Sequence, residues 1–148
     1  MIRAMTLADL PAAEALEQRC FSSVWNEAQL RYELEENEFS HALVLEEDGV
    51  LIGTMIYWIV FETCQLCRIA VSPQQRRKGY GRALLRRLME DAAAAGCEFI
   101  TLEVRTSNQA AIAMYEAMGF VRGGCRKNYY QDNGEDAYVY ARAPGVIE

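Results

Sequence analysis

The chain has 148 residues, of which 51% are hydrophobic and 24% are charged, and its formal net charge is −6. This length and balance predict one globular domain over residues 1–148 and exclude disordered, collagen-like and coiled-coil proteins. No apolar run approaches the roughly 20 residues of a membrane-spanning helix, and the first ten residues lack the apolar core of a secretory signal. We therefore expect a cytoplasmic protein that does not bind membranes.

The charged residues are distributed unevenly along the chain. Residues 1–62 hold 12 acidic and three basic residues, residues 63–89 hold seven basic and no acidic residues, and residues 90–148 hold nine acidic and five basic residues. A basic island within an acidic chain indicates a local anionic ligand and argues against direct nucleic-acid binding. The acidic remainder favours a cationic partner.

The cysteines predict neither a disulfide framework nor a metal site. Their number, five, is odd, and they are scattered along the chain. Cys64 and Cys67 form one C-x-x-C pair, but there is no second pair and His41 is the only histidine. With too few ligands for zinc, we expect no bound metal, and the cysteines are interpreted as small buried hydrophobic residues with one or two exposed thiols.

Apolar periodicity and turn residues predict seven strands and four helices. Asp48-Gly49 and Asn133-Gly134 indicate hairpin turns, Thr6 and Asn26 indicate helix starts, and Gly96 indicates a helix end. In chain order, the expected elements are strand 2–5, helix 7–21, helix 27–37, strands 41–46, 50–61 and 66–71, helix 82–95, strand 99–104, helix 108–118, and strands 120–130 and 137–141. Strand 66–71, helix 82–95 and strand 99–104 form a β-α-β unit, so we expect these two strands to be parallel.

The loop between strand 66–71 and helix 82–95 has the composition of a pyrophosphate cradle. It reads Gln75-Arg-Arg-Lys-Gly-Tyr-Gly-Arg82. Two glycines allow close approach of backbone N–H groups, the helix start adds unpaired N–H groups, and four cations surround them. It is neither a Walker A loop nor a dinucleotide fingerprint, because Arg82-Ala follows the second glycine. The alternative is a glycine-rich turn whose cations only solvate the helix start.

Glu103 is a carboxylate near the end of an otherwise apolar strand. Alternation places Phe99, Thr101 and Glu103 on one face of strand 99–104. Ligands of open α/β sheets gather at such strand ends, so Glu103 is a candidate functional residue. The alternative is a solvent-facing glutamate that pairs with Arg105 or Arg122.

Asn108 and Tyr115 share one face of the expected helix 108–118. Seven residues are nearly two helical turns, so both side chains can face the same site. The alternatives are that Asn108 is an N-cap and that Tyr115 packs in the core.

Taken together, these segments resemble the GNAT superfamily of acetyl-CoA-dependent N-acetyltransferases. The matching motifs are Ile69-Ala-Val-Ser-Pro, Arg76-x-x-Gly79-x-Gly81, Ser107-Asn108 and Tyr115-Glu-x-x-Gly119-Phe120. The resemblance implies an α/β (α+β) fold: a mixed, mostly antiparallel twisted sheet of about seven strands, with one central parallel β-α-β pair and helices on both faces. The runs Leu102-Glu-Val-Arg and Arg126-Lys-Asn-Tyr-Tyr are similar to members that acetylate the N-terminal alanine of a small-subunit ribosomal protein.

The resemblance also implies a role for each matching residue. Acetyl-CoA is the co-substrate, no metal is needed, Glu103 is the general base and Tyr115 is the general acid. The implied coenzyme-binding residues are Ile69, Ala70, Val71, Arg76, Arg77, Lys78, Gly79, Tyr80, Gly81, Arg82 and Asn108. The implied acceptor-binding residues are Trp25, Glu35, Tyr129 and Tyr130. The expected partner is the N-terminal peptide of a basic ribosomal protein, and the enzyme is expected to be a monomer or weak dimer.

Two positions depart from the family pattern, and two other functions stay open. Val24 precedes Trp25 where the family often has proline, and Arg68 stands where asparagine is common. The chain could acetylate a small amine or a lysine side chain, or it could be a non-catalytic module that binds acyl-CoA. The presence of both Glu103 and Tyr115 favours an enzyme, because a binding module needs neither.

Overall fold

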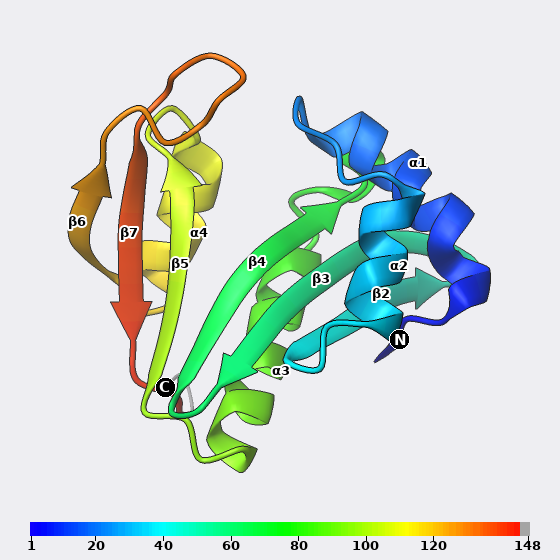
Figure 1. Ribbon diagram of the computed structural model, residues 1–148, viewed down its shortest axis with the longest axis horizontal. Coiled ribbons are helices and arrows are strands. Elements are labelled where there is room, and N and C mark those ends of the chain that lie inside the picture. The colour runs from blue at the N-terminus through cyan, green and yellow to red at the C-terminus, as the bar shows by residue number, and fades with distance from the viewer. Residues whose placement is uncertain (146–148) are drawn as a thin grey trace.

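The computed structural model describes residues 1–145, in which seven strands form one sheet and four α-helices pack on it (Figure 1). In chain order, the elements are β1 (Ile2–Ala4), α1 (Leu10–Cys20), α2 (Glu27–Glu35), β2 (Ser40–Glu47), β3 (Val50–Val60), β4 (Thr63–Val71), α3 (Tyr80–Ala94), β5 (Phe99–Arg105), α4 (Gln109–Ala117), β6 (Val121–Arg126) and β7 (Ala137–Arg142). The strand order is β1-β2-β3-β4-β5-β7-β6. Only β4 and β5 run parallel, which confirms the predicted β-α-β pair and the predicted sheet.

Two apolar clusters cover the two faces of the sheet. Strand alternation separates them: Leu43 and Met55 belong to the cluster that contains α3 and α4, whereas Val44 and Ile56 pack with α1 and α2. The larger cluster takes Leu84, Leu85, Leu88 and Met89 from α3 and Ile112 and Tyr115 from α4. Helices therefore lie on both faces, as expected, with α1 and α2 in front of the sheet in Figure 1 and α3 behind it.

The predicted boundaries of the elements between β3 and β5 are shifted. Strand β4 begins at Thr63, three residues before the predicted start, because Val60 and Thr63 pair directly across the turn after β3. Helix α3 begins at Tyr80 rather than Arg82, because Gly79, with φ +85°, already serves as its N-cap. Helix α2 ends at Glu35, two residues earlier than predicted.

The prediction that strand 120–130 reaches Tyr130 is wrong. Strand β6 ends at Arg126, and residues 127–136 form a connection that is held by polar contacts. Asn128 adopts φ +50° and donates its N–H to Asp136 Oδ1 at 2.8 Å, which directs the chain out of the ladder. The predicted turn residue Gly134 does have a left-handed φ of +73°, but it lies inside this longer connection.

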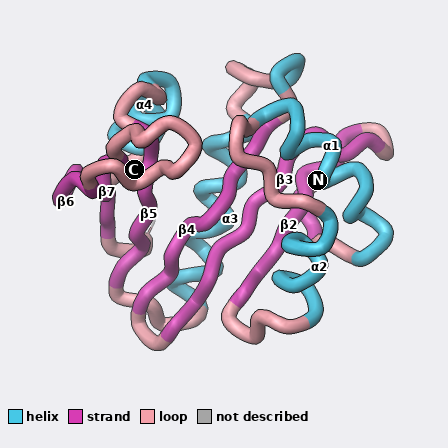
Figure 2. The backbone as a smooth tube through the Cα atoms, turned by 45° about the horizontal axis from the view of Figure 1, so that its top comes forward, coloured by secondary structure: helices cyan, strands magenta, loops and turns pink. Residues whose placement is uncertain are grey.

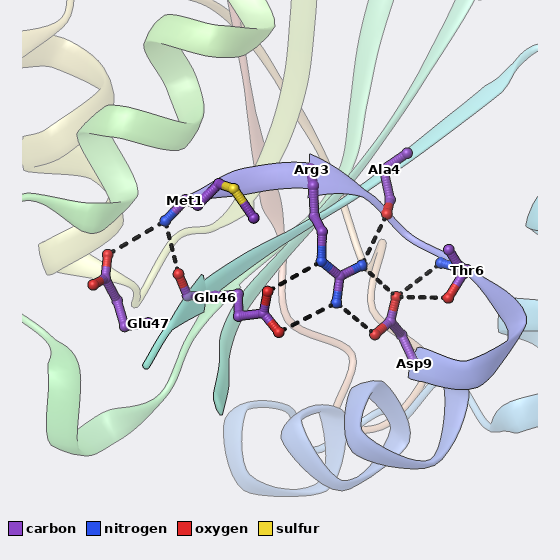
Figure 3. A network of polar contacts seen from close by, with 7 residues as sticks. All are labelled: Met1, Arg3, Ala4, Thr6, Asp9, Glu46 and Glu47. Atoms are coloured by element: carbon purple, nitrogen blue, oxygen red, sulfur yellow. Dashed lines mark hydrogen bonds and ion pairs between the residues drawn. The ribbon is translucent and has the colours of Figure 1, made fainter. Parts of the chain in front are cut away.

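The edge strand β1 is tied to the first helical turn by an arginine network (Figure 3). Arg3 donates to both carboxylate oxygens of Asp9 at 2.8 and 2.9 Å and pairs with Glu46 at 3.3 Å. The Arg3 hydrogen bonds lower the pKa of Asp9 to about 2, so this pair stays ionised through neutral pH. A short 3-10 helix, Leu7–Asp9, follows Thr6 and leads into α1.

Within residues 1–145, no helix is both long enough and apolar enough to cross a membrane.

Candidate functional site

The parallel strands β4 and β5 separate part of the way along their length. Their pairing runs from Thr63 with Phe99 to Leu66 with Leu102, although β4 continues to Val71 and β5 to Arg105. We call the separated segments, residues 67–71 and 103–105, the β4–β5 fork; their divergence is visible in both overall views (Figures 1 and 2). The edge of β4 that faces the fork therefore lacks pairing from β5 in the segment Ile69–Val71. Ser72 donates its N–H to Ile52 of β3, so alternation turns the backbone groups of Ala70 toward β3 and those of Ile69 and Val71 toward the fork, where they can bind a ligand.

The glycine-containing loop after β4 leads into the N-terminus of α3. Gly79 has φ +85° and Arg77 has φ +66°, so the chain turns sharply just before the helix. A Cβ atom on Gly81 would lie 2.9 Å from Met114 Sδ, so a larger residue there would require the Met114 side chain of α4 to move. Arg76, Arg77, Lys78 and Arg82 are exposed around Tyr80 at this positive helix end. Unpaired N–H groups at a helix start, together with four cations, are chemically suited to bind a pyrophosphate, and this role stays a prediction.

Glu103 lies in the fork and is held by two residues that the sequence analysis did not assign as its partners. Its Oε1 lies 3.3 Å from Arg126 Nε, and its Oε2 accepts a hydrogen bond of 3.4 Å from the Tyr129 hydroxyl. The alternative interpretation, in which Glu103 pairs with Arg105 or Arg122, does not match these contacts. Arg105 instead pairs with Asp132 at 2.8 Å and with Glu135 at 3.3 Å, because its guanidinium organises the connection after β6.

Tyr115 approaches the fork from the other face of the sheet. It projects from α4 into the cluster of α3 and α4, is 4% exposed, and makes an edge contact with Phe120. Glu103 alternates with the residues of that cluster, Leu102 and Val104, and so lies on the opposite face. Burial raises the pKa of Tyr115, which keeps its hydroxyl protonated at neutral pH.

Tyr130 packs its ring against Tyr129, and its pKa is raised. The two ring centroids lie 5.1 Å apart in an edge contact. Burial is the main cause that raises the pKa of Tyr130 to about 12, and the charge of Glu103 contributes. The Tyr130 hydroxyl is therefore protonated at neutral pH.

Asn108 acts as the N-cap of α4, which confirms the structural interpretation of this residue. Its Oδ1 accepts the N–H of Ala111 at 3.2 Å. This bond uses one lone pair of the side-chain oxygen and leaves the amide N–H₂ group of Asn108 available to a ligand.

The connection after β6 and the loop between α1 and α2 meet through a direct hydrogen bond. Ser22 donates to Asp132 Oδ2 at 2.6 Å, and these residues are 110 positions apart in the chain. The loop between α1 and α2 also carries Trp25, and the connection after β6 carries Tyr129 and Tyr130. Both segments lie at the top of the view in Figure 1. Sequence reasoning missed both Ser22 and Asp132, because neither stands in a motif or a periodic segment.

The acidic residues around α2 are not equivalent. Glu35 lies on an exposed face, where its carboxylate is 3.6 Å from Arg31, and it lines a shallow cavity with Glu27, Tyr32 and Glu36. None of the contacts described for residues 1–145 joins Glu35 to Glu103. Glu33, by contrast, is buried and accepts a hydrogen bond of 2.6 Å from Trp58 Nε1, so it does not contribute to an acidic surface.

The cysteine beside the fork is not an activated nucleophile. Burial raises the pKa of Cys67 to about 12, and the charges of Glu33 and Glu103 act in the same direction. The thiol is therefore protonated at neutral pH and unsuited to attack on a thioester. Among the described residues, no group of three His, Cys, Asp or Glu side chains is arranged to hold a metal ion.

Comparison with known proteins places the chain among acetyltransferases. The model of the acetyltransferase (GNAT) family matches residues 10–120. The ribosomal protein bS18-alanine N-acetyltransferase of Escherichia coli K12 is 37% identical over 95% of each chain, and the N-alpha-acetyltransferase RimI of Mycobacterium tuberculosis is 35% identical over 97% of this chain and 92% of the relative. A crystal structure of the Escherichia coli enzyme superposes with a TM-score of 0.89 at 35% identity, over 100% of this chain and 96% of the other.

A family match over most of the chain, close relatives along almost its full length, and a separated parallel strand pair beside a glycine-capped helix all agree. The chain belongs to the GNAT family and is an acetyl-CoA-dependent N-acetyltransferase.

Proposed function

We propose that this enzyme acetylates the N-terminal α-amine of a protein, and that its acceptor is the N-terminal alanine of ribosomal protein bS18. The observation that carries this proposal is the similarity along almost the whole chain to a relative named for that reaction and to one named as an N-alpha-acetyltransferase. We further propose that residues 1–148 act as one domain in the cytoplasm, as a monomer or weak dimer, without binding nucleic acid.

In this proposal the fork and the loop after β4 bind different parts of acetyl-CoA. The backbone of Ile69, Ala70 and Val71 holds the pantetheine arm and the acetyl carbonyl through groups that β5 leaves unpaired. An N–H near Val71 faces the oxyanion that forms during transfer. The N–H groups at the start of α3 and the cations of residues 76–82 bind the pyrophosphate, and the amide of Asn108 contacts coenzyme A.

Gly79→Ala tests the pyrophosphate role. Alanine in the left-handed conformation at φ +85° costs roughly 1–2 kcal/mol of folding stability and shifts the N–H groups of the cradle. We expect at least a fivefold weaker affinity for acetyl-CoA, measured by calorimetry, since about 1 kcal/mol corresponds to this factor. Gly49→Ala is the matched control, because Gly49 has φ +77° and is equally open, but lies in the β2–β3 turn. A similar loss of affinity in both variants, or none in Gly79→Ala, would contradict the role.

The chemistry of an α-amine suits the two groups that flank the fork. Its pKa is about 7.7–8.0, so roughly a tenth is neutral at pH 7, whereas a lysine near 10.4 is less than about a thousandth neutral. Glu103 takes the proton from the ammonium, directly or through a water, and the nitrogen attacks the thioester carbon. As the C–N bond forms and the C–S bond breaks, Tyr115 gives its proton to the departing sulfur. The protonated Cys67 thiol supports direct transfer, without an acetyl-enzyme.

The acceptor peptide is proposed to lie between the two loops that meet at Ser22 and Asp132. Trp25 belongs to one loop, and Tyr129 and Tyr130 belong to the other, where Tyr129 already contacts Glu103. Glu35 lies farther out on α2 and is proposed to attract basic residues that follow the N-terminal alanine.

Acceptor competition tests the proposed function. The enzyme is given acetyl-CoA with a peptide beginning Ala-Arg-Tyr-Phe, the same peptide with a blocked α-amine and an added lysine, or spermidine, and thiol release is followed. We expect kcat/KM for the free α-amine to exceed both others by at least tenfold, given the roughly 2.5-unit difference between the pKa values of α-amine and lysine. A preference for spermidine or for the lysine peptide would overturn the proposal in favour of a small-amine or lysine acetyltransferase.

A further inference from the structure

Arg68 of β4 makes a dense set of contacts with the loop between α1 and α2. Its guanidinium forms an ion pair with Glu17 of α1 and donates a second hydrogen bond to the same carboxylate at 3.3 Å. It also donates to the main-chain oxygen of Ser23 at 2.9 Å. The Arg68 side chain is 15% exposed and that of Glu17 only 2% exposed, so this pair is largely removed from water.

Two aromatic rings of the same loop cover the guanidinium. Arg68 Cζ lies 3.8 Å from the centroid of the Phe21 ring and 5.0 Å from that of the Trp25 ring. The N–H of Trp25 donates to Glu17 Oε1 at 2.9 Å. Residues 21–26 form no helix or strand, so the Arg68–Glu17 pair supplies much of the order of this loop.

The ordered loop also reaches across the fork. Ser22 lies between the anchored residues Phe21 and Ser23 and donates to Asp132, which Arg105 holds from the end of β5. Arg68 on β4 and Arg105 on β5 thus each fix one loop, and the Ser22–Asp132 hydrogen bond joins the two. Arg68 directly precedes Ile69, the first residue of the segment proposed to hold the acetyl arm.

We propose that Arg68 is a positioning residue, which fixes the loop of residues 21–26 in the place where the acceptor peptide binds, relative to β4. The inference rests on the proposed function for the identity of the acceptor, but the anchoring of the loop does not. Arginine is required because its planar fork bonds Glu17 and Ser23 while its face stacks on Phe21; a lysine ammonium makes point contacts only.

Arg68→Lys is the decisive variant, because it keeps the positive charge beside the buried Glu17 and removes the fork and the stacking. We expect kcat/KM for the Ala-Arg-Tyr-Phe peptide to fall about tenfold or more, because a displaced loop would no longer position the peptide for reaction. For alaninamide, which is too short to contact the loop along its length, kcat/KM should stay within about twofold, as should the affinity for acetyl-CoA. An equal loss for both acceptors, or no loss for the peptide, would overturn the proposal.

Hydrogen exchange supplies a readout that needs no acceptor. The N–H of Trp25 donates a hydrogen bond to Glu17, and its exchange rate should rise about tenfold in Arg68→Lys. The exchange rates of the β3 amides should not change. Unchanged exchange at Trp25 would overturn the anchoring role. Failure of the wild-type enzyme to acetylate the peptide would instead refute the proposed function, and exchange would then decide the role of Arg68.

Two further variants provide a control and a substitute for Arg68→Lys. Arg3→Lys is the matched control, because Arg3 also joins two carboxylates (Figure 3) but lies on β1, which β2 and β3 separate from β4. This variant should leave kcat/KM for both acceptors and the exchange rate of the Trp25 amide unchanged. If Arg68→Lys fails to fold, the neutral pair Glu17→Gln with Arg68→Gln leaves no buried charge unpaired. That pair should show the same selective loss of peptide turnover, and wild-type turnover by it would refute the inference.

Discussion

Replacing Glu103 by glutamine is expected to slow acetyl transfer by about 10²-fold or more, with nearly unchanged affinity for acetyl-CoA. The amide keeps the size of the side chain and can still accept a hydrogen bond from Tyr129, but it cannot take a proton from the acceptor ammonium. Steady-state rates with the Ala-Arg-Tyr-Phe peptide and a calorimetric titration with acetyl-CoA measure the two effects separately.

Glu62→Gln is the control for this experiment. Glu62 is an exposed carboxylate at the turn between β3 and β4. The variant therefore changes the net charge by the same amount as Glu103→Gln but leaves the fork unaltered. It should retain wild-type turnover. Wild-type turnover in Glu103→Gln as well would remove Glu103 from the role of general base, and an equal fall in acetyl-CoA affinity would assign it to coenzyme binding.

Tyr115→Phe is expected to lower kcat by about 10²-fold while leaving the free energy of unfolding within about 0.5 kcal/mol of wild type. The hydroxyl stays protonated because burial raises its pKa, so it can donate a proton as sulfur departs. None of the hydrogen bonds described within residues 1–145 uses this hydroxyl, and phenylalanine preserves the packing on Phe120. Stopped-flow thiol release and chemical denaturation measure the rate and the stability.

Tyr140→Phe is the matched counterpart and should behave in the opposite way. Tyr140 is also buried, but its hydroxyl donates to Glu116 at 2.7 Å and lies 3.3 Å from Arg122. Losing these bonds should lower the free energy of unfolding by about 1 kcal/mol and leave kcat unchanged. A wild-type kcat in Tyr115→Phe would show that another group protonates the sulfur.

The sequence predicts the order of the elements and the parallel pair because those features depend on local periodicity and on turn residues. The failed prediction at the end of β6 has a different physical origin. Residues 127–136 are held by contacts of Arg105 with Asp132 and of Asp136 with Asn128, which join residues far apart compared with the two-residue period of a strand. A periodicity argument cannot detect them, and the aromatic pair Tyr129-Tyr130 extended the apparent strand.

The sequence indicates which single residues are candidates for the site, but it does not predict how they are arranged in space. Alternation in β5 correctly separated Glu103 from the buried face, and the helical spacing in α4 indicated Tyr115. Their placement on opposite faces of the sheet also needs α4 to pack on the face that Leu102 and Val104 line, and this packing is a tertiary contact that no local pattern encodes. In the same way, the partner of Arg68 is Glu17, 51 residues earlier, so only the fold could show what this departure from the family pattern does.

A crystal structure of the enzyme with a bisubstrate conjugate, in which coenzyme A is joined through an acetyl bridge to the α-nitrogen of the Ala-Arg-Tyr-Phe peptide, tests the central claim most directly. The account predicts that the conjugate crosses the sheet at the β4–β5 fork. Its sulfur should lie within hydrogen-bond distance of the Tyr115 hydroxyl, and its nitrogen should lie near Glu103, directly or through one water. A conjugate whose sulfur and nitrogen lie away from these two groups would contradict the account.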